Sequence, residues 1–147
     1  MSDSAFGFER AEDSPGFLLW KTTVRWQRLI KEALERYDVS HSQFVIMAIL
    51  LWWKEKKTDV TQIDLVKESQ LDKMTVSKAL RKLEKMGLVG RHENASDSRA
   101  KTVYLSDAGV ALAKKLVPVV EGIDAEFFGI LSDMEHDHLL VALQKLS

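Results

Sequence analysis

A run of lysines and arginines between residues 73 and 91 could neutralise the phosphates of a nucleic acid. Six basic residues stand there against a single acid, Glu84. Cations at this density release counterions when they meet DNA, and that release supplies affinity without sequence preference. A solvated helix face has the same composition, and the basic run taken alone favours that plainer interpretation. The six residues are Lys73, Lys78, Arg81, Lys82, Lys85 and Arg91.

The acidic residues gather elsewhere in the chain. Between residues 118 and 147 six acids stand against Lys145, although the formal net charge of the whole chain is only −1. Charge is therefore segregated along the sequence. Such segregation is expected when one part of a protein faces phosphates and another part does not.

The basic run coincides with a predicted amphipathic helix over residues 73–86. Val76, Leu80 and Leu83, helped by Ala79, follow helical spacing and predict a buried face, which leaves the basic side chains outside. Residues near the helix start could reach base edges, with Lys78 able to bond guanine and Met74 or Thr75 able to touch a thymine methyl. These candidate base contacts are Lys73, Met74, Thr75, Ser77 and Lys78, and the candidate phosphate contacts are Arg81, Lys82 and Lys85.

The helices that position this segment have recognisable starts. A polar N-cap follows an apolar residue that can pack four positions beyond the cap, as in Val39-Ser40 with Phe44. Ser14 before Pro15, and Ser132 with Glu135, mark two further starts. The sequence predicts six helices, over about 15–37, 41–56, 62–69, 73–86, 107–130 and 133–146, with Pro118 expected to kink the fifth.

The third and fourth predicted helices are joined by three residues, which is the turn length of a helix-turn-helix. Gly87 then supplies a stop, and residues 88–93 and 101–105 predict two strands around a polar loop at 94–100. The expected fold is mostly α with a small β-hairpin, or wing. A helix able to enter a groove, followed by a charged hairpin, is what a winged helix-turn-helix needs to grip duplex DNA.

Length and composition exclude several classes of protein. At 147 residues a single domain is expected, and the absence of cysteine excludes disulfides, thiolate metal sites and thiol redox sensing. The longest apolar run, Phe44 to Trp53, is too short to span a bilayer, and the first fourteen residues lack the features of an export signal. We therefore expect a cytoplasmic protein with no membrane partner.

The first, fifth and sixth helices carry wide apolar faces that need partners.

The span from Thr61 to Gly109 resembles the MarR family of bacterial transcriptional regulators. The resemblance rests on Thr75-Val76-Ser77, on Leu83–Val89 followed by Arg91, on Asp97-x-Arg99 and on Leu105–Gly109. Looser similarity extends over nearly the whole chain. It implies a single MarR-like domain over 1–147, with a winged helix-turn-helix lobe at 38–105 and dimerisation helices at 15–37 and 106–147.

The resemblance also implies how DNA is bound. An obligate homodimer would place each fourth helix in a major groove and each wing against the flanking minor groove of a palindromic operator in double-stranded DNA. Arg99 would approach the minor groove, and Asp97 would hold the wing through an ion pair; an exposed turn pair is the plainer alternative. The expected DNA contacts are Lys73, Met74, Thr75, Ser77, Lys78, Arg81, Lys82, Arg91, Arg99 and Lys101.

Many members of the family bind a small aromatic or lipophilic effector between the dimer helices and the DNA-binding lobe. By resemblance the tryptophans are candidates for such a pocket, although Trp at helical spacing more often lies in the core. The candidates are Trp20, Trp26, Trp52 and Trp53. We expect no cofactor. We also expect no metal, because His136 and His138 are two residues apart and lie on different helix faces.

The sequence thus predicts a ligand-responsive regulator, acting as a repressor, that binds DNA as a homodimer. Two alternatives stay open. The winged helix could serve as a protein-interaction scaffold with a merely solvated basic helix. Alternatively, the protein could be an enzyme or a small-molecule carrier that uses the tryptophan-rich interior. No arrangement of catalytic residues in the sequence supports an enzyme.

Overall fold

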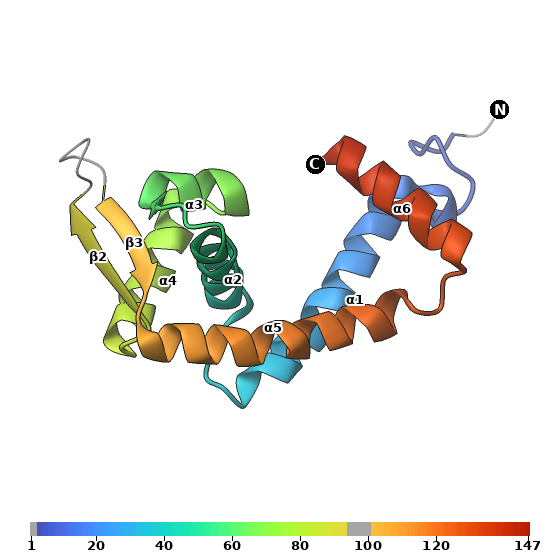
Figure 1. Cartoon of the computed structure of the whole chain (residues 1–147). Helices are drawn as coiled ribbons and strands as arrows, with labels where there is room; N and C mark the ends of the chain where they lie inside the picture. Colours follow the sequence, from blue (N-terminus) through green and yellow to red (C-terminus); the bar gives the residue numbers. More distant parts are fainter. Residues whose placement is uncertain (1–2, 94–100) are drawn as a thin grey trace.

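The computed structural model describes residues 3–93 and 101–147. Within these residues a 3₁₀ helix at Ala11–Asp13 precedes six α-helices and three short strands. Figure 1 shows a lobe of α2, α3, α4 and the strands on one side, α1 and α6 on the other, and α5 running between them. The helices are α1 Pro15–Glu35, α2 His41–Glu55, α3 Gln62–Ser69, α4 Lys73–Lys85, α5 Asp107–Phe128 and α6 Asp133–Leu146; the strands are β1 Val60–Thr61, β2 Val89–Glu93 and β3 Lys101–Leu105.

Every predicted N-cap makes its hydrogen bond. Ser40 accepts from the backbone N–H of Gln43, and the Gln43 side chain accepts from the N–H of Ser40, which completes a capping box. Capping boxes also form at the starts of α3 and α6. These caps satisfy backbone donors that each helix start would leave unpaired, and they fix where each helix begins. The six caps are Ser14, Ser40, Thr61, Asp72, Ser106 and Ser132.

The strands form one antiparallel sheet in the order β1-β3-β2. Val103 of β3 lies between Val60 of β1 and Arg91 of β2. The hairpin of β2 and β3 was predicted, whereas β1 was not, because two residues are too short to show an alternating pattern. The predicted wing loop at 94–100 lies outside the described residues.

Helix α2 is the centre of the core. Its buried side chains pack against α4 and the sheet on one side, and Phe44 joins α1 and α5 on the other. In that second cluster Ile30 and Leu34 of α1 meet Leu116 and Val120 of α5. The two clusters are bridged by the half-buried Met86, Leu112 and Val117, which pack against both of them. The buried α2 residues are Gln43, Phe44, Ile46, Met47, Leu50 and Leu51.

The end of α4 is attached directly to the start of α5. Gly87 leaves α4 with a φ of 74°, in the left-handed region that favours glycine. The Ser106 hydroxyl donates to the carbonyl oxygen of Gly87 at 2.6 Å, and the Ser106 N–H donates to that of Leu88 at 2.9 Å. One residue therefore caps α5 and holds the chain that leaves α4. We call this contact the α4–α5 junction.

The far ends of the long helices leave apolar surface exposed in the single chain. Within the described residues α6 has no buried side chain, and Leu140, Leu143 and Leu146 are all exposed. The first turns of α1 are exposed as well, with Trp20 at 67%. Helix α5 runs without interruption through Pro118 to Phe128. None of the described helices has the length and apolar character needed to cross a membrane.

The α4–α5 junction leaves no room for a side chain at Gly109. An added Cβ would overlap the backbone carbonyl of Leu88, which cannot rotate away. We expect Gly109→Ala to destabilise the fold by about 1–3 kcal/mol, as overpacking does, despite the better helix propensity of alanine. Thermal unfolding measures this. In the control, Gly122→Ala, the added Cβ meets nothing within 4 Å of the same chain. Equal stability of the two variants would contradict the close approach.

Candidate nucleic-acid interface

Helix α4 begins at a firmly capped position. The Thr75 N–H donates to Asp72 Oδ1 and the Thr75 hydroxyl donates to Asp72 Oδ2, both at 2.8 Å. The backbone hydrogen bond from Thr75, followed by the hydroxyl bond, lowers the pKa of Asp72. Gln70 enters the left-handed region, with a φ of 60°, and makes the sharp turn from α3. The Thr75 hydroxyl is therefore engaged within the first turn of α4, and the residue is half-buried.

The predicted inward face of α4 is confirmed. Val76, Ala79, Leu80 and Leu83 are all buried in the lobe. Opposite them runs one outward row at helical spacing, in which every side chain is exposed and Met74 is 69% exposed. We call it the outer row: Met74, Lys78, Arg81 and Lys85. One apolar side chain near the helix start and three cations beyond it therefore point the same way.

The flank of α4 that faces the sheet carries Glu84. The Arg91 guanidinium of β2 forms an ion pair with Glu84 and donates from Nη1 to Gln62 Oε1 of α3 at 2.8 Å. The Arg91 side chain is only 22% exposed. Predicted as a DNA contact, Arg91 is placed by the structure where it ties α3, α4 and β2 together.

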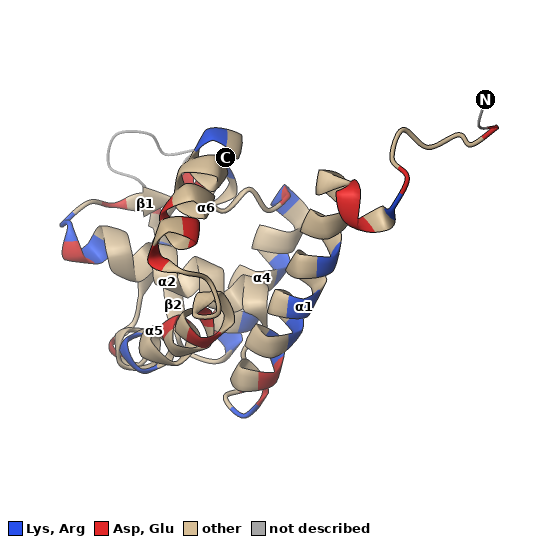
Figure 2. Cartoon of the chain, turned by 90° about the vertical axis from the view of Figure 1, so that its right-hand side faces the viewer, with Lys and Arg blue, Asp and Glu red and all other residues tan. Residues whose placement is uncertain are grey.

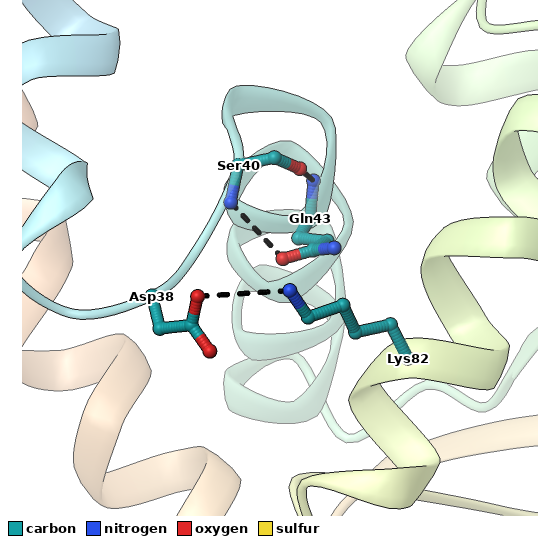
Figure 3. A network of polar contacts seen from close by, with 4 residues as sticks. All are labelled: Asp38, Ser40, Gln43 and Lys82. Carbon is teal, nitrogen blue, oxygen red and sulfur yellow. Dashed lines mark hydrogen bonds and ion pairs between the residues drawn. The ribbon is translucent and has the colours of Figure 1, made fainter.

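The opposite flank of α4 carries Lys82. Its Nζ lies 3.6 Å from Asp38 Oδ1, in the linker between α1 and α2. Figure 3 shows this ion pair beside the capping box of Ser40 and Gln43. Lys82 therefore lies to one side of the outer row. Ion pairs hold α4 on both flanks, one to β2 and one to the linker.

The described part of the wing adds one cation and an aromatic contact. Lys101 is exposed and lies opposite Glu93 across the hairpin. The rings of His92 and Tyr104 lie 5.4 Å apart, and Tyr104 covers Gly90. The two wing residues implied by the resemblance, Asp97 and Arg99, lie outside the described residues.

Helix α1 carries a second set of cations that the sequence analysis did not single out. Lys21, Arg25, Arg28 and Lys31 are exposed or half-buried and recur every three or four residues. That spacing was visible in the sequence, but it lay among the apolar residues of the same helix. Figure 2 shows these basic bands along α1 and acidic bands on α6. Basic bands on α1 and acidic bands on α6 thus lie on separate helices.

The four tryptophans do not share a pocket. Trp26 lines a cavity of about 630 Å³ between α1, the linker, α2, the turn before α4 and the last turn of α4, where Asp38 and Lys82 form part of the wall. Trp20 lines a groove of about 850 Å³ between α1, α5 and α6. Trp52 is exposed beneath the Lys56 ammonium, and Trp53 packs against the core.

The cavity wall around Trp26 is fixed by one polar and one aromatic contact. The indole N–H of Trp26 donates to Asp124 Oδ1 at 2.7 Å, and its ring meets that of His41 edge-on at 5.1 Å. Burial lowers the pKa of His41, and the charge of Asp124 opposes that shift. Burial between α1 and α2 therefore favours the neutral form of the imidazole.

The two histidines of α6 were considered as metal ligands. Among the described residues, no group of three or more His, Asp or Glu side chains could hold a metal ion. The His136 ring instead lies edge-on to Phe128, with ring centres 6.4 Å apart. This contact packs His136, in the first turn of α6, against the last residue of α5.

Known proteins match both the sequence and the fold. The ArnR1-like, winged-helix domain family matches residues 35–122. The HTH-type transcriptional regulator YdcH of Bacillus subtilis is 37% identical over 139 residues, covering 95% of this chain and 93% of the relative. The chain therefore belongs to the ArnR1-like winged-helix family of HTH-type transcriptional regulators.

Solved structures share the fold over nearly the whole chain. BpsR of Bordetella bronchiseptica superposes with a TM-score of 0.83 at 24% identity, covering 95% of this chain and 97% of that one. MepR of S. aureus, solved as a complex with DNA, gives a TM-score of 0.81 at 24% identity, covering 90% of this chain and 96% of that one. The predicted fold, mostly α with a winged helix-turn-helix, is confirmed.

The lowered pKa of His41 predicts a pH-dependent stability. Between the folded pKa and the ordinary value of 6.5, the unfolded chain binds more protons, so stability falls as the pH drops through this window. We expect the thermal midpoint to fall between about pH 7.5 and 5.5. The glutamine of His41→Gln does not titrate in this pH range, so the thermal midpoint of that variant is expected to fall less. Equal falls in both proteins would contradict a neutral His41.

Proposed function

We propose that the protein regulates transcription by binding specific sites in duplex DNA as a homodimer. The observation that carries the proposal is the outer row of α4. It is fully exposed on the second helix of a helix-turn-helix, while the opposite face is buried. A major groove admits a helix of this kind, with its first turns at the bases and its later turns near phosphates.

The individual roles follow from position along α4. Met74 and the Thr75 methyl suit thymine methyl groups, Lys78 suits a guanine edge, and Arg81 suits a phosphate. Lys73, Ser77 and Lys82 flank the row, and Lys101 with Arg99 and Asp97 extends the interface into the wing. The ion pair of Arg91 with Glu84 supports a positioning role, in which Arg91 sets the angle between α4 and the wing.

The dimer is supported by surface that one chain leaves uncovered. The groove between α1, α5 and α6 is mainly apolar and includes Trp20, Phe127 and Leu139. An exposed apolar groove of this kind is typical of an interaction site. The basic bands of α1 and the acidic bands of α6 would also complement each other between two copies. We assign the lobe to residues 38–105 and the dimerisation helices to 15–37 and 106–147.

A small-molecule effector is the second part of the proposal. In the similar protein BpsR, DNA binding is regulated by 6-hydroxynicotinic acid. In this chain the cavity beside Trp26 lies between the dimerisation helices and the lobe, and Lys82 connects it to α4. An aromatic or lipophilic ligand there would act on the position of α4. We propose such a ligand-responsive repressor, without enzymatic activity, working in the cytoplasm where the DNA is.

Replacing a cation of the outer row tests the DNA-binding proposal. Arg81→Gln should weaken binding to DNA from upstream of the protein's own gene and lower the slope of log K against log salt by about one. Fluorescence anisotropy over a salt series measures both. The control Lys114→Gln removes the same charge from α5 and should bind as the unmodified protein does. If no site gives a salt-sensitive complex, the interaction-scaffold alternative is favoured.

The wing is tested separately with Arg99→Ala. A guanidinium in the minor groove is favoured by the negative potential there, so its loss should weaken operator binding while the thermal midpoint stays unchanged. The anisotropy titration is repeated over the same salt series. Operator affinity equal to that of the unmodified protein at every salt concentration would contradict a minor-groove role.

The dimer is tested by placing a charge on α6. Leu143 is an exposed apolar side chain there, and Leu143→Glu should shift the mass measured by sedimentation equilibrium from two chains towards one. Gln144→Glu introduces the same acid at the neighbouring exposed position and should leave the mass unchanged. A monomeric unmodified protein would contradict the dimer.

A further inference from the structure

Lys82 differs from the other cations of α4 because a carboxylate already holds it. Its Nζ lies 3.6 Å from Asp38 Oδ1, while Lys78, Arg81 and Lys85 point outward in the outer row. Both partners of the pair reach solvent, at 49% for the Lys82 side chain and 82% for that of Asp38. Lys82 therefore lies within one helical turn of the outer row but is turned towards the linker (Figure 3).

The backbone that carries the Asp38 carboxylate is fixed, and the short side chain can move little from it. Asp38 has a φ of 54°, and its N–H donates to the carbonyl oxygen of Glu35 at 3.0 Å. The next two residues are the buried Val39 and the N-cap Ser40. Lysine, by contrast, has a flexible four-carbon stem and can reach several positions from one backbone site.

Two anions would therefore compete for one lysine. An exposed ion pair is weak and is screened by salt, so Asp38 cannot hold Lys82 against a strong competitor. A DNA phosphate lying along α4 is such a competitor, because contact with it also releases a condensed counterion. Lys82 would then have to leave Asp38 before it could contact DNA. The loss of this ion pair would reduce the net free energy of DNA binding.

We propose that Asp38 sets the affinity for the operator by competing with a DNA phosphate for Lys82. The inference rests on the proposed function, since it concerns DNA binding through α4. It makes Asp38, a residue outside the expected DNA contacts, a positioning residue that lowers affinity through Lys82.

The test is a double-mutant cycle on operator binding. Asp38→Asn keeps the shape of the side chain, and asparagine tolerates the left-handed backbone at this position. We expect Asp38→Asn to bind about twofold to fivefold more tightly at low salt, with the gain shrinking as salt rises. Lys82→Gln should bind more weakly, with a salt slope lower by about one. The double variant should bind as Lys82→Gln does.

Controls separate this competition from a general charge effect. Glu35→Gln removes the same charge from the wall of the same cavity and should change affinity less than Asp38→Asn does. Asp38→Glu, which keeps the carboxylate, should restore an affinity close to that of the unmodified protein. Thermal unfolding of Asp38→Asn should match that of the unmodified protein within about two degrees, since exposed pairs add little stability.

The outcomes distinguish this inference from the proposed function. If Asp38→Asn binds no more tightly than the unmodified protein, or tightens binding equally when Lys82 is absent, the inference is overturned and the proposed function stands. If the unmodified protein forms no complex with any DNA site, both are overturned. Tightening that depends on Lys82 supports the inference.

Discussion

The arrangement of the DNA-binding surface depends on the α4–α5 junction. Ser106 caps α5 and at the same time bonds the carbonyl groups of Gly87 and Leu88, through which the chain leaves α4. Gly109 lets the first turn of α5 approach the Leu88 backbone. The start of α5 is therefore fixed to the end of α4 within a few residues. A movement of α5 against its partner in the proposed dimer would be carried directly to α4.

Helix α4 is also held from its sides by groups that carry charge. Arg91 ties it to the sheet through Glu84, and Asp38 ties it to the linker through Lys82. The first pair is the less exposed of the two and is suited to fixing an angle, whereas the second is exposed and exchangeable. The outer row is left clear for the proposed contact with DNA. In the proposed complex, one restraint on α4 would set the orientation of the helix and the other would adjust its affinity for DNA.

Local rules were enough to predict the helices and the hairpin from the sequence. Caps such as Ser40 and Ser132 bond within three residues, so their patterns mark helix starts wherever the chain folds. The two-residue strand β1 escaped prediction because only its pairing with β3 defines it. The pairing of Arg91 with Glu84 and the separation of the tryptophans were also missed. They depend on how distant elements pack, and spacing along the chain does not encode that.

A hydroxyl-radical footprint on a genomic fragment selected by the protein tests the central claim most directly. If two copies present α4 as described, two protected segments related by a dyad will lie on one face of the DNA, about one helical turn apart or a multiple of it. Their spacing should match the pseudo-palindrome of the selected sequence. A single unsymmetrical protected segment, or uniform protection along the fragment, would contradict a dimer that recognises a specific operator.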